Sequence, residues 1–232
     1  MVRSRLTPVF LSARGCPGFP DPRLADESGM LAIGGDLAPE RLRLAYESGI
    51  FPWYDAGLPP MWWSPDPRAL LDPEHLQVSR SMRRVLSKGG FGITANRAFG
   101  QVIEACASNR PEGTWLIPDM IEAYTLLHQS GDAHSFEVWR ADELVGGLYG
   151  VQRGALFAAE SMFHTETNAS KVALVAAVRF LFKAGIELFE VQFLTEHLAS
   201  MGAFEVSREE YLARLKTACG KCVTLGARTL AT

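Results

Sequence analysis

The order of strand-like and helix-like segments over residues 134–194 constrains the fold of this chain most. Residues 134–163 alternate or run apolar as β-strands do. A long apolar helix pattern follows, with Asn168 as its N-cap and Gly185 as its stop, and residues 186–194 then read as a further strand. An antiparallel meander, a helix and a strand in this order match the core of the acetyltransferase superfold (GNAT). We therefore expect an α+β fold with a mixed sheet and helices.

The N-terminal part of the chain differs in composition and is rich in Pro and Gly. Residues 37–49 predict a helix that ends at Gly49. The next stretch, 49–68, holds three of the five tryptophans among five prolines, with no helical or strand period. We therefore expect two unequal domains: a small N-terminal α+β domain over residues 1–65, which contains most of this loop, and an acetyltransferase-like domain over residues 66–232.

Composition limits the classes of partner. With 47% hydrophobic residues in 232, the chain can bury a full core. A net charge of −3 gives no global electrostatic attraction to nucleic acid or to a membrane, so such a partner would have to be held locally. The N-terminal residues do not form a signal peptide, and no segment approaches the ~18 apolar residues of a membrane span. We expect a cytoplasmic protein without a membrane partner.

One short segment could hold a polyanion locally. Residues 79–89 predict a helix with Ser79 as its N-cap and Gly89 at its end. Its basic residues recur at helical spacing and project together: Arg80, Arg83, Arg84 and Lys88. Such a row is either a solvated face or a device for gripping phosphates. The spacing alone leaves both interpretations open.

The metal-binding residue types form no recognisable site. Cys219 and Cys222 stand two residues apart after a helical pattern, and a zinc site would need two further ligands at matching spacing. The five histidines show no paired spacing. We expect no metal, and we interpret the two cysteines as reduced surface thiols rather than a redox motif.

The candidate chemistry rests on polar residues in strands. The sequence has no GxGxxG, GxxxxGK[ST] or GxSxG motif, so neither a phosphate loop nor covalent catalysis is expected. Glu160 lies in "AESMF", and Glu190 with Gln192 lies in "FEVQF". Residues two apart on a strand leave the same face. A carboxylate in apolar surroundings needs a partner or a function, and the pattern leaves both open.

Several longer motifs, in order and at matching spacing, closely resemble the leucyl/phenylalanyl-tRNA protein transferases of bacteria. They run from about Phe19 to Leu215 and read "GMLAIGGDLAPERLRLAYESGIFPW", "WWSPDPR", "GTW", "HSFEVW", "LVGGLYG", "AESMF", "NASK" and "HLASMGA". The resemblance implies an aminoacyltransferase that moves Leu or Phe, with Met as a further donor, from aminoacyl-tRNA to proteins that begin with Arg or Lys, marking them for degradation. It implies no cofactor. We expect a monomer.

The resemblance also assigns the tryptophans. Trp53 of "FPW" and Trp115 of "GTW" should line the site of the terminal adenosine of the tRNA. Stacking on an aromatic ring contributes about 1–3 kcal/mol per base and tolerates any base. We expect Trp62 and Trp63 to pack and anchor the loop. With so few other contacts to nucleic acid, the basic helix is favoured as the tRNA acceptor-stem contact.

By similarity to the family, an apolar pocket should hold the donor amino acid, lined by Leu148, Phe157, Leu174, Ala177 and Leu181. A misfit of one methylene there is worth about 1–3 kcal/mol, enough to select Leu, Phe or Met over Ile and Val. Ala177 and Leu181 stand where the family has aromatic side chains. The pocket is therefore expected to be wider, with an altered preference between Leu and Phe.

An aminoacyl ester is already activated, so the remaining tasks are to deprotonate and orient the amine. We expect Gln192 to orient the attacking amine, Glu190 to polarise it through Gln192, and Glu160 to bind an amine or a ribose hydroxyl. The family has Asp-Cys-Gln where this chain has residues 190–192, and Gly where it has Ala159. The longer carboxylate at position 190 has a different reach, which leaves two alternatives open: a displaced base, or a catalytic route that uses the tRNA's own hydroxyl.

Two other classes of protein, a CoA-dependent acetyltransferase and a non-catalytic RNA-binding module, fit the sequence less well. A CoA-dependent acetyltransferase should show a glycine-rich pyrophosphate turn before its long helix, and residues 162–171 contain no glycine. A non-catalytic RNA-binding module would explain the tryptophans and the basic helix. Such a module would have no use for Glu160 and Gln192 beside an apolar pocket.

Overall fold

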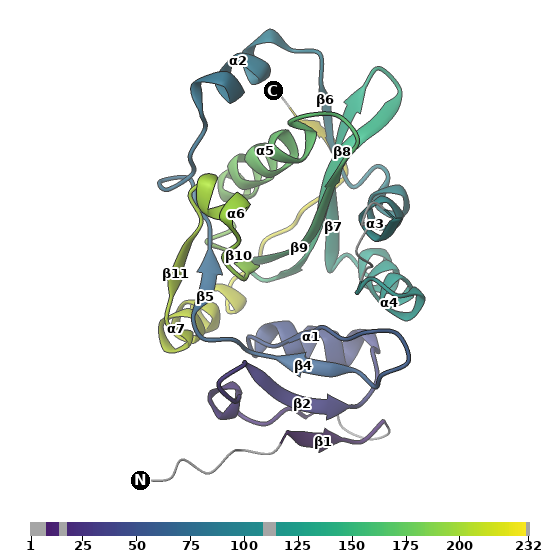
Figure 1. Ribbon diagram of the computed structural model, residues 1–232, viewed down its shortest axis with the longest axis vertical. Coiled ribbons are helices and arrows are strands. Elements are labelled where there is room, and N and C mark those ends of the chain that lie inside the picture. The colour runs from purple at the N-terminus through teal and green to yellow at the C-terminus, as the bar shows by residue number, and fades with distance from the viewer. Residues whose placement is uncertain (1–7, 14–17, 109–114, 231–232) are drawn as a thin grey trace.

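The computed structural model describes residues 8–13, 18–108 and 115–230, which form two sheets (Figure 1). The smaller sheet has the strand order β1-β2-β4-β3, and the larger has the order β11-β5-β10-β9-β8-β7-β6-β12. The chain leaves the smaller sheet after Trp63 and enters the larger sheet at Arg68. In Figure 1 the smaller sheet and its helix α1 lie below the larger sheet.

The larger sheet is mixed, because β10 pairs parallel with β9 and antiparallel with β5. The strands are β1 (Val9–Leu11), β2 (Met30–Gly34), β3 (Phe51–Pro52), β4 (Met61–Trp63), β5 (Arg68–Leu70), β6 (Gly92–Ala95), β7 (Ala133–Arg140), β8 (Glu143–Arg153), β9 (Leu156–His164), β10 (Leu188–Gln192), β11 (Phe204–Val206) and β12 (Arg228–Leu230). The helices are η1 (Pro22–Leu24), α1 (Pro39–Glu47), α2 (Arg80–Lys88), α3 (Phe99–Ser108), α4 (Pro118–Gln129), α5 (Ala169–Ala184), α6 (Glu196–Ser200) and α7 (Arg208–Cys219). The expected α+β fold with a mixed sheet is confirmed.

Alternation along β8 and β9 gives the larger sheet two covered faces. Leu148 and Phe157 belong to the apolar cluster built on α5, whereas Tyr149 and Ala158 belong to the cluster built on α3 and α4. Successive side chains on a strand point to opposite faces, so each strand contributes to both clusters. In Figure 1, α5 lies on one side of the strands, and α3 with α4 lies on the other.

The two caps of α5 differ in how closely they follow the conformation expected from the sequence. Gly185 is the C-cap with φ 106°, a left-handed conformation that glycine adopts without steric cost, and this prediction is confirmed. Asn168 stands at the N-cap position, but its φ is 74° and its side chain makes no capping bond. Its backbone carbonyl accepts the Val172 N–H instead. The predicted position of the N-cap is therefore confirmed, although its side chain makes no capping bond.

The smaller sheet is joined to the larger one through a common core. One apolar cluster contains Leu42 and Trp62 from the N-terminal part together with Tyr124 and Tyr149. Leu42 and Tyr46 of α1 are buried there. The proposed domain boundary after residue 65 stays a prediction. No helix of the described chain is both long and apolar enough to cross a membrane.

Candidate active site

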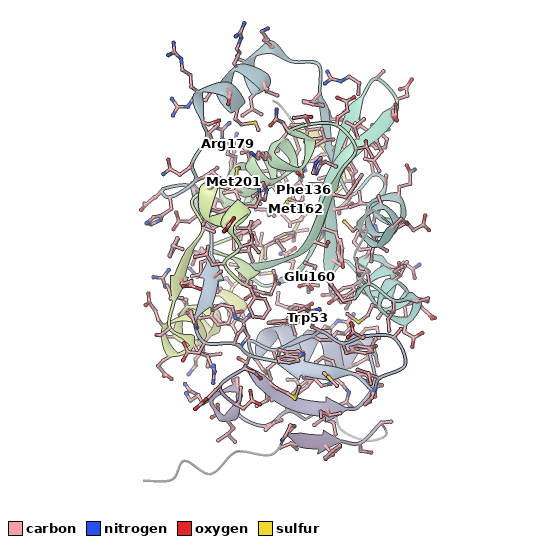
Figure 2. The ribbon with its side chains drawn as sticks, viewed as in Figure 1. Trp53, Phe136, Glu160, Met162, Arg179 and Met201 are labelled. Atoms are coloured by element: carbon pink, nitrogen blue, oxygen red, sulfur yellow. The ribbon has the colours of Figure 1, made fainter. Side chains whose placement is uncertain are left out.

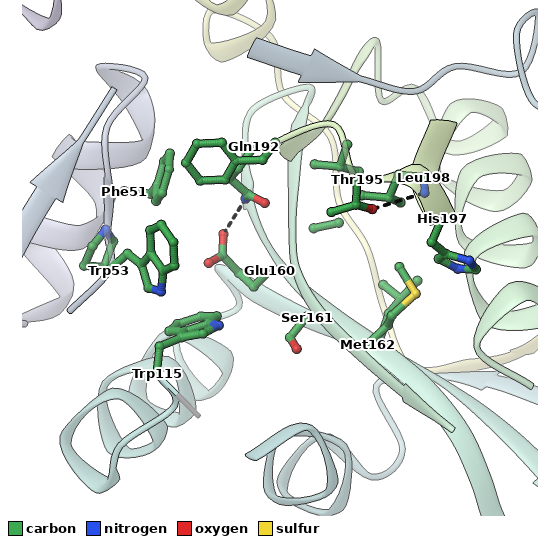
Figure 3. A pocket seen from close by; sticks show the side chains of 15 residues that line it. Phe51, Trp53, Trp115, Glu160, Ser161, Met162, Gln192, Thr195, His197 and Leu198 are labelled. Carbon is green, nitrogen blue, oxygen red and sulfur yellow. Dashed lines mark hydrogen bonds between the residues drawn. The ribbon is translucent and has the colours of Figure 1, made fainter. Parts of the chain in front are cut away.

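A cavity of about 400 Å³ lies between β3 of the smaller sheet and β8, β9 and β10 of the larger one. Most of its wall is aromatic or aliphatic: Phe51, Trp53, Trp115, Leu148, Met162, Val191, Phe193 and Leu198. Its polar side chains are Glu160, Ser161, Gln192, Thr195 and His197 (Figure 3). A mainly apolar cavity with a few convergent polar groups is the usual form of a small-molecule site.

The three tryptophans of the proline-rich stretch have different roles. Trp62 is fully buried and its indole N–H donates to the Gly34 carbonyl at 2.9 Å. Trp63 donates to the backbone oxygen of Trp53 at 2.7 Å, and the two rings lie 5.9 Å apart. The packing and anchoring roles expected for Trp62 and Trp63 are confirmed. Trp53 is 43% exposed, lines the cavity and lies on the same side of it as Trp115 (Figure 3).

Glu160 meets Gln192 at the cavity wall. The Gln192 side-chain amide donates to Glu160 Oε1 at 3.1 Å, and the Tyr124 hydroxyl donates to Glu160 Oε2 at 3.1 Å. Tyr124 is in turn hydrogen-bonded to the Tyr46 hydroxyl at 2.7 Å. Of the described residues that line the cavity, Glu160 is the one carboxylate. Figure 3 shows Glu160 between Gln192 and the two tryptophans, and Figure 2 shows Trp53 and Glu160 where the smaller sheet meets the larger one.

Glu190 is placed differently from Gln192. A register shift separates the two residues where β10 pairs with β5, and Gln192 has a φ of 55°. Glu190 is buried and forms an ion pair with Arg68 at 2.5 Å, and it does not line the cavity. The Arg68 guanidinium also donates to the Gly49 carbonyl at 2.6 Å and lies 4.3 Å from the centre of the Tyr211 ring.

The five residues expected around the donor side chain are all buried, but they occupy two depths. Leu148 lines the cavity. The other four belong to the same apolar cluster without forming the cavity wall: Phe157, Leu174, Ala177 and Leu181. Met162 and Leu198 form the apolar wall beside Leu148.

The basic helix α2 lies away from the cavity, at the top of Figure 1. The Ser79 hydroxyl accepts the Met82 N–H, and Gly89 is the C-cap, so both predicted ends are confirmed. Met82 is buried while all four basic residues are exposed: Arg80, Arg83, Arg84 and Lys88. The predicted row of solvent-facing cations is therefore present.

A histidine forms part of the cavity wall on the side opposite the tryptophans. His197 lines the cavity there (Figure 3). Burial lowers the pKa of His197, and the nearby Lys171 and His164 lower it further. The lowered pKa favours the neutral form of His197 at pH 7, so its imidazole contributes little positive charge to this wall.

Several residues around the cavity could not have been found from local sequence. Tyr46 and Tyr124 come from α1 and α4, 78 residues apart, and Arg68 meets Glu190 across 122 residues. The one available signal for Arg68 was its place in "WWSPDPR", directly after the tryptophan loop. Phe193 follows "FEVQ" directly, and its exposed ring packs 5.7 Å from Trp53.

Comparison with known proteins identifies the family. Residues 70–216 match the model for leucyl/phenylalanyl-tRNA protein transferase, and residues 35–66 match the model for the N-terminal domain of the same protein. A leucyl/phenylalanyl-tRNA protein transferase from Anaeromyxobacter dehalogenans is 55% identical over 214 residues, 91% of each chain. One from Escherichia coli O1:K1 is 54% identical over 196 residues, 84% of each chain.

Solved structures give more distant similarities. An aminoglycoside acetyltransferase from an uncultured soil metagenomic sample is 18% identical and matches 47% of this chain and 82% of its own, with a TM-score of 0.37. The L-PGS structure from Bacillus licheniformis is 13% identical and matches 82% of this chain and 64% of its own, with a TM-score of 0.39. The two family models and the relatives above 50% identity decide the assignment: this chain belongs to the leucyl/phenylalanyl-tRNA protein transferase family.

Proposed function

We propose that this protein transfers Leu or Phe, and Met as a further donor, from aminoacyl-tRNA to the α-amino group of proteins that begin with Arg or Lys. Such transfer marks the acceptor for degradation by the N-end rule. The family assignment and the sequence identity to named transferases over most of the chain support this activity. We expect the enzyme to act as a monomer in the cytoplasm.

The observation that carries the proposal is the composition of the cavity. Two tryptophans, a carboxylate paired with an amide, and an apolar wall face one space: Trp53 and Trp115, Glu160 and Gln192, and Leu148 with Met162. An aminoacyl-adenosine has a flat base, an ester and an apolar side chain, which match these three surfaces.

The terminal adenosine should stack on the exposed ring of Trp53. We expect Trp53→Ala to weaken binding of the aminoacyl-tRNA by about 1–3 kcal/mol, which is roughly five- to 150-fold in the dissociation constant. Filter binding of charged tRNA measures this. The control is Leu58→Ala, which removes an exposed apolar side chain from the same loop but outside the cavity. Equal affinity of the Trp53 variant and the wild type would exclude stacking on this ring.

The tRNA acceptor stem should contact α2. Each phosphate neutralised by a basic side chain releases counterions and contributes about 0.7–0.9 to the slope of log affinity against log salt concentration. We expect the double variant Arg83→Gln/Arg84→Gln to reduce that slope by about 1.4–1.8 and to leave transfer at saturating tRNA little changed. Titrations between low and moderate salt measure the slope.

A matched charge change elsewhere separates this contact from net charge. Arg214 and Lys216 are exposed on α7, away from α2, and their exchange to Gln removes the same two charges. That control should keep the wild-type salt slope. A slope equally reduced in both double variants would indicate a non-specific charge effect and contradict the contact with α2.

The activity itself is tested with labelled Leu and Phe carried separately on tRNA. The acceptors are a peptide that begins with Arg and the same peptide acetylated at its N-terminus. We expect transfer from both tRNAs to the free peptide, and none to the acetylated one, since the α-amine is the nucleophile. Absence of transfer from either tRNA, with tRNA binding intact, would favour a non-catalytic RNA-binding protein.

A further inference from the structure

The carboxylate of Glu160 is fixed from two sides while one part of it remains at the cavity. Its Oε2 accepts the Tyr124 hydroxyl, and its Oε1 accepts the Gln192 amide. Because a hydroxyl has a single hydrogen, the bond of 2.7 Å between the two tyrosines must then be donated by Tyr46. Tyr46 and Tyr124 are both fully enclosed by protein. The chain of hydroxyls therefore orients Glu160 rigidly without opening a route to solvent.

The carboxylate of Glu190 has a structural role, because it forms a buried ion pair with Arg68. It is 1% exposed and its ion pair with Arg68 is enclosed completely. The Arg68 guanidinium is held in place by the Gly49 carbonyl and by the ring faces of Tyr211 and Phe51. A carboxylate that compensates a buried guanidinium cannot take a proton without leaving that cation unpaired. Glu190 is thus a poor acceptor for a proton from the cavity.

We propose that Glu160, and not Glu190, accepts the proton of the attacking α-amine, and that Tyr124 with Tyr46 are positioning residues for this carboxylate. The proposal deepens the proposed function and rests on it. It assigns the Arg68–Glu190 pair to the support of β5, β10 and Phe51. It also gives the two glutamates separate roles, one in proton transfer and one in support of the fold.

The step balances within the cavity. The nitrogen lone pair of the free amine forms the new bond to the ester carbonyl carbon, and one N–H proton passes to ionised Glu160. The bond from that carbon to the ribose oxygen breaks, and the ribose oxygen takes the proton from Glu160. The products are an amide and a free tRNA hydroxyl, and Glu160 returns to its ionised form. Gln192 donates its N–H to Glu160, which leaves its carbonyl oxygen to accept another hydrogen of the amine.

The surroundings of Glu160 suit this proton transfer. Burial raises the pKa of Glu160 to about 8; the polar hydroxyl of Tyr46, the hydrogen bond from Tyr124 and the charge of Arg68 lower it, and the charge of Glu190 raises it. These groups face it from α1, α4, β5 and β10. The protonated form of a free α-amine has a pKa of about 7.7–8.0, so the amine and Glu160 reach their reactive, deprotonated forms over the same pH range.

The test compares Glu160→Gln with the paired variant Arg68→Met/Glu190→Met, using Phe-tRNA and a peptide that begins with Arg. We expect Glu160→Gln to slow transfer at saturating tRNA by about 10²–10⁴-fold, and the paired variant to slow it by less than about tenfold. Affinity for tRNA and the melting temperature establish that each variant is folded. The paired change removes both buried charges together, so neither is left without a partner.

The pH profile of transfer tests the role of Glu160 directly, because a purely structural role of Glu160 would leave that profile unchanged. Below pH 7 both Glu160 and the amine must lose a proton, so log kcat/KM for the peptide should rise with a slope of about two in the wild type and about one in Glu160→Gln. Tyr124→Phe removes a hydrogen bond that lowers the pKa of Glu160, so its rising limb should move to higher pH.

The outcomes separate the proposal from the activity on which it rests. One outcome would overturn the proposal: the wild-type enzyme transfers Phe, the Glu160→Gln variant is within tenfold of it, and the paired variant is nearly inactive. This outcome would indicate that Glu190 accepts the proton. If the wild-type enzyme transfers neither Leu nor Phe, the proposed function itself is contradicted, and the role of Glu160 as proton acceptor is contradicted with it. Loss in Glu160→Gln, retention in the paired variant and the change in slope together would support it.

Discussion

Replacing Arg68 alone by methionine is expected to destabilise the protein by about 3–5 kcal/mol, because it leaves a buried charge uncompensated. Arg68 is 0% exposed, and its partner Glu190 is 1% exposed. The variant also loses the hydrogen bond to the Gly49 carbonyl and the contacts with the Tyr211 and Phe51 rings. Urea unfolding at pH 8, followed by tryptophan fluorescence, measures the free energy of unfolding.

The loss in this variant should depend on pH in a definite direction. Without Arg68, burial favours the uncharged, protonated form of the Glu190 carboxyl, whereas the unfolded chain exposes this carboxyl to water. The folded variant then binds more protons than the unfolded chain, so its stability falls as the pH rises. The destabilisation relative to wild type should therefore be smaller at pH 5 than at pH 8.

Arg68→Met/Glu190→Met is the matched control for stability as well as for activity. A buried ion pair exchanged for well-packed apolar groups is often neutral in stability, since the cost of desolvating both ions disappears. We expect this variant to recover most of the loss and to show a flatter dependence on pH. A single Arg68→Met variant that costs less than about 1 kcal/mol would mean that water reaches the pair, and would contradict its burial.

Structural features that depend on a few neighbouring residues could be predicted from the sequence. Ser79 and Gly89 bound α2, and the spacing of its basic residues put them on the exposed face, because helix ends and helix faces follow from a few neighbouring residues. Pro and Trp density marked the segment of the N-terminal part that reaches the cavity, although separating Trp53 from Trp62 required the family resemblance. Strand alternation indicated the meander but could not show which strands border the cavity.

The parts that were missed depend on long-range packing. Nothing near Tyr46 or Tyr124 in the sequence indicates that their hydroxyls meet, since both read as ordinary apolar positions of amphipathic helices. The period of two placed Glu190 and Gln192 on one face, but the register shift in β10 separates the contacts that their side chains make. The donor pocket followed from the family, and the depth at which each residue lies is set by the packing of α5 on the sheet.

Replacing Gln192 by alanine is expected to lower kcat by about 10²-fold or more and to leave tRNA affinity unchanged. The variant removes the amide that binds Glu160 Oε1 and orients the amine, while the stacking surfaces of Trp53 and Trp115 remain. Single-turnover transfer from Phe-tRNA to a peptide that begins with Arg measures kcat, and filter binding measures the affinity. Equal losses in both quantities would place Gln192 in donor binding.

Two further variants separate the amide's chemistry from its bulk and from general damage. Gln192→Met keeps the length of the side chain without its polar groups, so it should be as impaired as the alanine variant if orientation by hydrogen bonds is what matters. Gln152 is also a buried glutamine, but its amide binds the Gly154 and Val223 carbonyls, away from the cavity. Gln152→Ala should therefore lower stability and retain kcat. If Gln192→Met instead kept wild-type kcat, its role would be packing, and Glu160 would have to orient the amine alone.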